Sequence, residues 1–142
     1  MLIRTACVAV IIAFGPAIAF AQDIIAQRQA LMKRSGAEAR VGAQMARGEV
    51  PFDAAKAQAI FATFADKAAK LPTLFPDNSK AGDTRAAPAI WEKPAEFKAE
   101  IAKFAADAKK GQETAKDLES FKAAFSATGR DCGSCHETFR KN

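Results

Sequence analysis

Residues 121–140 read FKAAFSATGRDCGSCHETFR, a stretch that joins an apolar helical pattern to a group of chemically reactive side chains. Phe121, Phe125 and Thr128 recur at helical spacing, and the same face continues into Cys132–His136 and Phe139. Offsets of three and four residues place side chains on one face of an α-helix. The pattern therefore predicts a long helix whose core-facing stripe ends in two thiols and an imidazole.

The segment Cys132-Gly133-Ser134-Cys135-His136 has the spacing of a covalent haem site. Its two thiols can be alkylated by the vinyl groups of a haem while the adjacent histidine ligates the iron. His136 is the only histidine of the chain, so ligation by a second histidine is excluded. We therefore predict one haem c, attached at Cys132 and Cys135, with His136 as the proximal axial iron ligand.

Three other uses of this motif agree less well with the sequence. A thioredoxin-like pair stands at the start of a helix that follows a strand, whereas the residues before Cys132 read as helix. Zinc needs three or four ligands at metal spacing, and no second cluster is present to complete such a site. A structural disulfide between Cys132 and Cys135 would leave the adjacent histidine unexplained.

The N-terminal residues have the pattern of a secretory signal. A basic start precedes an apolar stretch over about residues 6–18, which is too short for a comfortable bilayer span, and Ala19-Phe20-Ala21 has the form cut by signal peptidase. We predict that residues 1–21 are removed, that Gln22 begins the mature chain and that no membrane anchor remains. Because Cys7 leaves with the signal, both remaining cysteines belong to the haem motif, which suits the oxidising periplasm.

Composition and charge narrow the class of protein further. The mature chain, residues 22–142, is long enough for one domain with a single core. The formal charge is +5, and basic and acidic residues alternate along the chain, which argues against a nucleic-acid partner. A mildly basic surface is compatible with an acidic redox partner protein. Since no paired carboxylates, activated nucleophile or phosphate-binding loop is visible, we expect a protein that is not an enzyme.

The hydrophobic periodicity predicts an all-α fold with four helices. Alanine and lysine are abundant, tyrosine is absent, and no segment alternates with the period of a strand. The first helix should span about Asp23–Arg47, with Gly48 as a stop signal. The second should lie between Pro51 and Pro72. The third should start at Pro94 and end before Gly111, and the fourth should cover residues 118–139.

The segment between the second and third helices follows no period. Prolines, Gly82 and the Asp77-Asn78-Ser79 cluster indicate a long connection, with a short turn around Ala89–Trp91. A loop of this length in a small domain usually has a function or crosses the bundle. We predict an antiparallel four-helix bundle with the haem between its helices near the C-terminus, and a long connection that provides one crossover.

The chain resembles the class II cytochromes c, the cytochrome c-prime family, over essentially its whole mature length. The resemblance rests on several motifs in order: Arg28-Gln29-Ala30-Leu31-Met32, RGEVPFDAA at residues 47–55, Leu74-Phe75-Pro76, Ile90-Trp91, and Cys132–His136 followed by Phe139-Arg140. It implies a four-helix bundle in which His136 is the proximal ligand and Met32 stands at the distal position. It also implies haem contacts for four further residues: Arg28, Gln29, Arg85 and Arg140.

Met32 separates two functions within this family. Some members are five-coordinate and high-spin with an apolar distal residue, whereas others are six-coordinate and low-spin with methionine on the iron. Arg28 and Met32 lie one helical turn apart, so the guanidinium can meet a haem propionate while the thioether points at the metal. A methionine on an apolar helical face can also be core filler. Met45 lies over three turns from Met32, beyond reach of the same iron.

The expected function is periplasmic electron transfer by a cytochrome with Met32 and His136 on the iron. The alternative is a gas-binding module, in which an open distal site takes NO or CO. The family implies pairing through the first two helices, but their predicted outer faces are charged, which favours a monomer or a weak homodimer. The charged residues assigned to these faces are Lys33, Arg34, Glu38, Arg40, Lys56, Lys67 and Lys70.

Overall fold

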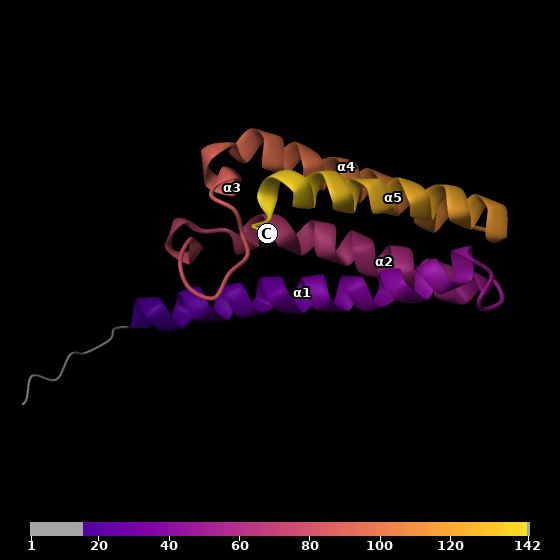
Figure 1. The fold of residues 1–142 in the computed structure, drawn as a ribbon, viewed down its shortest axis with the longest axis horizontal. Coiled ribbons are helices and arrows are strands. Elements are labelled where there is room, and N and C mark those ends of the chain that lie inside the picture. The colour runs from indigo at the N-terminus through magenta and orange to yellow at the C-terminus, as the bar shows by residue number, and fades with distance from the viewer. Residues whose placement is uncertain (1–15, 142) are drawn as a thin grey trace, which may run out of the picture.

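The computed structural model describes residues 16–141, and helices account for most of them (Figure 1). The four long helices are α1 (Pro16–Ala46), α2 (Ala54–Lys70), α4 (Pro94–Thr114) and α5 (Leu118–Phe139). Three short elements lie in the long connection: η1 (Leu71–Leu74), η2 (Asp77–Ser79) and α3 (Ala89–Glu92). The prediction of an all-α fold with a short turn before the third long helix is confirmed.

The long helices form a bundle in which neighbours in sequence are neighbours in space. Helix α1 packs against α2 and α5, and α4 packs against α2 and α5. Successive long helices run in opposite directions along the bundle (Figure 1). The antiparallel four-helix bundle is confirmed, but the predicted crossover is wrong. The connection between α2 and α4 stays at one end of the bundle, where η1 and η2 pack against α1. Helices α2 and α4 are therefore direct neighbours, and the connection does not cross the bundle.

Local signals explain where the helices begin and end. The Asp53 carboxylate caps α2 by accepting a hydrogen bond of 3.0 Å from the Lys56 backbone N–H. Asp117 and Ser120 form a reciprocal capping box at the start of α5. Gly48 follows α1 with φ of 74°, a left-handed conformation that glycine adopts without steric cost. These polar and glycine signals are readable in the sequence because each acts within a few residues.

The start of α1 differs from the prediction. The helix begins at Pro16 rather than near Asp23, so the predicted cleavage after Ala21 falls within it. Residues 1–15 lie outside the described part of the chain, and the signal peptide stays a prediction. Within residues 16–141, no helix is both long enough and apolar enough to span a membrane.

The end of α4 also differs from the prediction. The helix continues through Gly111 to Thr114 instead of stopping before the glycine. Gly111 is buried, and a Cβ placed on it would lie 2.5 Å from Cε1 of Phe61 on α2. The glycine is therefore a close-approach point between two helices, and tertiary packing overrides its tendency to end a helix.

Candidate haem pocket

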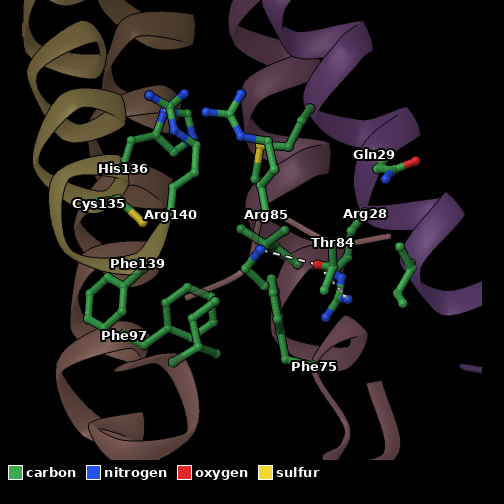
Figure 2. A pocket seen from close by; sticks show the side chains of 15 residues that line it. Arg28, Gln29, Phe75, Thr84, Arg85, Phe97, Cys135, His136, Phe139 and Arg140 are labelled. Atoms are coloured by element: carbon green, nitrogen blue, oxygen red, sulfur yellow. Dashed lines mark hydrogen bonds between the residues drawn. The ribbon is translucent and has the colours of Figure 1, made fainter. Parts of the chain in front are cut away.

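A pocket of about 300 Å³ lies at the end of the bundle beneath the long connection (Figure 2). Its walls come from α1, α4, α5 and the connection, which are far apart in the sequence. Most of the wall is apolar, formed by Ile25, Leu71, Phe75, Ile90, Phe97 and Phe139. Such a pocket, mostly apolar with a few polar groups, is typical of a cofactor site.

The pocket brings together most of the predicted site residues. Met32 of α1 and His136 of α5 line the same cavity, and Cys135 lies beside the histidine. The remaining predicted haem contacts also line it: Arg28, Gln29, Arg85 and Arg140. Cys132 is not part of the pocket wall, but it is half-buried one turn before Cys135 and packs against the apolar core.

The two cysteines do not have the properties of a redox-active thiol pair. Both are free thiols in the last turns of α5. Burial raises the pKa of Cys132 and raises that of Cys135 to about 11, whereas a reactive thiol needs a lowered pKa. No group of three or more histidine, cysteine or acidic side chains able to hold a metal ion occurs in residues 16–141. The thioredoxin and zinc alternatives are therefore not supported.

His136 has the properties of a neutral metal ligand. The imidazole is half-buried, and burial lowers its pKa, with smaller contributions from the cations Arg140, Lys67 and Arg85. Nη1 of Arg140 lies 3.5 Å from Nδ1 of the imidazole. A lowered pKa favours the neutral ring, which is the form that binds a metal. The donor set of two thiols and one neutral imidazole fits haem c.

Arg28 is a buried residue that holds the connection in place. It is 5% exposed, and its guanidinium donates to the Leu74 carbonyl at 3.2 Å and to the Ser79 hydroxyl and carbonyl at 3.1 and 3.0 Å. A further hydrogen bond of 3.2 Å reaches the Thr84 hydroxyl (Figure 2). The Phe75 ring lies 4.7 Å from the guanidinium carbon. The predicted propionate contact of Arg28 stays a prediction, because both Nη atoms already bind the connection.

The C-terminus joins the connection beside the pocket. The Ala87 N–H donates to the Phe139 carbonyl at 3.0 Å, and the Lys141 N–H donates to the Arg85 carbonyl at 2.8 Å. These two hydrogen bonds hold Arg85 and Arg140 at the same rim of the pocket. On the opposite wall, the Gln29 side chain donates to the Asp83 carbonyl at 2.9 Å. The connection is therefore tied to both α1 and the end of α5.

Sequence reasoning placed Lys67 on the outer face of α2, and this prediction was wrong. Lys67 is 6% exposed, and its ammonium lies 4.1 Å from the centre of the Phe104 ring. The side chain turns inward because it follows Phe64 by three residues and lies on the apolar stripe of its helix. A polar residue within an apolar stripe was the signal that could have identified it.

Two further polar residues are buried on the inward faces of their helices. Ser35, one turn after Met32, is 5% exposed, and its hydroxyl has no hydrogen-bond partner in the described residues. Asp131, directly before Cys132, is 2% exposed and accepts a hydrogen bond from Lys103 through Oδ1, while Oδ2 is left without a partner. Burial raises the pKa of Asp131.

An antiparallel four-helix bundle with a haem attachment motif at the end of its last helix defines a class of c-type cytochromes. The family model described as "Cytochrome C'" matches residues 23–140. A cytochrome c' of Rhodopseudomonas palustris is 44% identical over 99% of this chain and 97% of its own length. A cytochrome c-556 of the same organism is 37% identical over 98% of this chain and 97% of its own length.

A solved structure agrees with these relatives. The cytochrome c' of Rhodopseudomonas palustris superposes with a TM-score of 0.81 at 45% identity, covering 84% of this chain and 97% of that one. The chain belongs to the cytochrome c' family, which also contains the c-556 cytochromes. The prediction of covalent haem c as its cofactor is confirmed by this membership together with the cysteines near the C-terminus.

Proposed function

We propose that this protein is a periplasmic electron carrier whose haem iron is bound by His136 and Met32. The observation that carries the proposal is that these two side chains line one pocket from different helices, α5 and α1. Haem c supplies a one-electron iron couple, and a methionine–histidine ligand pair raises its reduction potential. The similarity to a cytochrome c-556 along nearly the whole chain is compatible with this function.

The two cysteines and the other residues of the pocket would bind and shield the cofactor. Cys132 and Cys135 hold the haem covalently, so that it stays bound in both oxidation states. The apolar wall, including Phe97 and Phe139, would exclude water from the bound haem. Arg85 and Arg140 stand at the rim, where cations would pair with the haem propionates. Ligation by Met32 is the part of this assignment that decides the function.

The optical spectrum of the purified holoprotein tests the proposal. With Met32 on the iron, the ferrous protein shows the sharp, split bands of low-spin haem, and CO binds slowly or hardly at all. The ferric protein then shows a weak near-infrared transition between sulfur and iron. A high-spin ferrous spectrum with rapid CO uptake would contradict ligation by Met32.

The second candidate function is binding of NO or CO at an open distal site. The observation that favours it is that Met32 shares its pocket with the apolar residues Ile25, Leu71 and Ile90, which suit a small uncharged ligand. In this case Met32 is only part of the wall. The same spectrum distinguishes the two functions, because an open site gives high-spin haem.

Location and assembly follow from the same proposal. Proteins of this family are periplasmic, and we expect export of this chain by residues 1–21. Mass spectrometry should then find a chain that begins at Gln22 and carries one haem. The partners would be redox proteins, which donate electrons to the haem iron and accept electrons from it. Sedimentation at micromolar concentration should show a monomer or a weak dimer, and a tight dimer would overturn this expectation.

A further inference from the structure

Lys67 is a cation in the interior of the bundle that has no acidic partner among residues 16–141. Its ammonium lies over two aromatic rings, 4.1 Å from the centre of Phe104 and 5.9 Å from that of Phe64. The ion pairs of lysines in residues 16–141 are made by other side chains, namely Lys70, Lys80, Lys93 and Lys103. Aromatic rings attract a cation, but they do not neutralise its charge.

The helix register turns Lys67 into the bundle, toward α4. Arg34 of α1 and Asp66 of α2 form an exposed ion pair of 3.4 Å, which sets the two helices side by side at this level. The next residue of α2, Lys67, is directed inward. Its ammonium lies over the ring of Phe104 on α4. The preceding residue of α4, Lys103, pairs with Asp131, which directly precedes Cys132 on α5. The buried ammonium therefore lies at the level of the segment that holds the haem.

The cysteines give Lys67 no counter-charge in the holoprotein. A thioether sulfur carries no charge, so the ammonium of Lys67 stays without a compensating anion from the residues that hold the haem. Ferric iron carries one more positive charge than ferrous iron. A nearby cation therefore disfavours the ferric state, and the effect is larger in a dry interior than at the surface.

We propose that Lys67 is an electrostatic determinant of the haem reduction potential, which raises the potential by disfavouring ferric iron. The proposal deepens the electron-carrier function and rests on it only in requiring haem attached at Cys132 and Cys135. It does not depend on whether Met32 is the sixth ligand. The nearest neighbour on the outer face, Lys70, pairs with Asp66 at 2.8 Å and is exposed, so it provides a matched control.

Redox titration of the holoprotein and its variants tests this role. Lys67→Met, an unbranched apolar replacement, should shift the equilibrium about tenfold toward ferric haem, which is about 59 mV for one electron. Lys67→Gln provides a second neutral variant in case the first folds poorly. Lys67→Arg keeps the charge and should keep the potential near that of the wild type, and Lys70→Met should leave it unchanged.

Two further measurements distinguish this electrostatic role of Lys67 from a structural role. The shift of Lys67→Met should persist at high salt, because buried charges are screened much less than exposed ones. The optical spectrum should keep the spin state of the wild type, whichever state that is. An unchanged potential in both neutral variants would overturn the proposal, as would equal shifts in Lys67→Arg and Lys67→Met or a changed spin state in Lys67→Met. The ferrous spectrum of the wild type tests the Met32 assignment separately.

Discussion

The two ends of the bundle differ in what their interiors contain. At the end formed by the α1–α2 turn and the start of α5, Met45, Phe61 and Phe121 are fully buried. The rings of Phe61 and Phe121 lie 5.9 Å apart in an edge-to-face arrangement. Toward the end beneath the long connection, the interior also holds charged side chains and further polar ones, which are Arg28, Ser35, Lys67, Ser79 and Asp131, while Thr63 and Thr128 are buried midway along α2 and α5.

This difference shows a division of labour within one small domain. Burial of apolar side chains stabilises the fold, whereas each buried polar group without a hydrogen-bond partner destabilises it. Toward the pocket end, Ser35 and Asp131 each have an oxygen atom without a hydrogen-bond partner within residues 16–141, which lowers the stability of this part of the bundle. We infer that the far end supplies stability and the pocket end supplies the cofactor site.

The largest expected effect concerns the haem itself. Replacing Cys132 and Cys135 together with serine should abolish covalent attachment, because a hydroxyl does not form the thioether. Acid–acetone should then extract all the haem, and mass spectrometry should give the mass of the chain without haem. The control is Ser134→Ala, which removes a hydrogen bond of 2.8 Å to Glu100 on the exposed side of α5 and should retain its haem. Haem that resists extraction in the double serine variant would contradict the attachment site.

Substitutions of the two methionines of α1 allow a direct comparison of the two ends of the bundle. Met45→Ala should cost about 2–5 kcal/mol of unfolding free energy, because Met45 is fully buried at the far end, and it should leave the optical spectrum unchanged. Met32→Ala should change the spectrum from low spin to high spin and lower the reduction potential, because the ferrous state loses a soft ligand. Urea unfolding and optical spectra of both holoproteins measure the two effects. Equal spectra for Met32→Ala and the wild type would assign Met32 to the pocket wall.

Arg28 tests how the connection is held over the pocket. Arg28→Met should lower the unfolding free energy by about 1.5–3 kcal/mol, since it removes hydrogen bonds from a charged donor and leaves buried acceptors at Leu74 and Ser79. Hydrogen exchange should become faster in residues 74–84. Gln29→Ala is the control, because its hydrogen bond to Asp83 is exposed and should change stability little. If residues 74–84 of Arg28→Met kept the wild-type protection against hydrogen exchange, the contacts with the C-terminus would suffice to hold the connection over the pocket.

Glycine-to-alanine substitutions in the bundle should give the smallest changes in stability, and the two changes should have opposite signs. Gly111→Ala should destabilise the far end by about 1–3 kcal/mol, because its Cβ would overlap the Phe61 ring. Gly36→Ala should stabilise α1 by about 0.5–1 kcal/mol, since nothing lies within 4 Å of the added methyl group and alanine is the better helix former. Thermal unfolding of the two variants measures the difference. A neutral Gly111→Ala would mean that Phe61 can move aside.

Much of the fold was predictable because its signals are local. The apolar stripe of α5 carries Cys132 and His136 to the core side, and the caps at Asp53 and Asp117 mark helix starts within one turn of the chain. The pocket residues named from the sequence lie together because that stripe and the N-terminal half of α1 face each other. The orientation of Lys67 was missed, although its spacing from Phe64 indicates the buried face, because a charge was taken as evidence of exposure.

By itself, the sequence determined the helices, their caps and the haem attachment motif, because each depends on residues within a few positions of one another. Only the tertiary structure decided that Gly111 lies inside a helix, since the reason is a ring from α2. It also decided that the long connection folds back over the pocket, because the groups that hold it, Arg28 and the end of α5, are distant in sequence. Such contacts depend on which helices become neighbours, which no local pattern specifies.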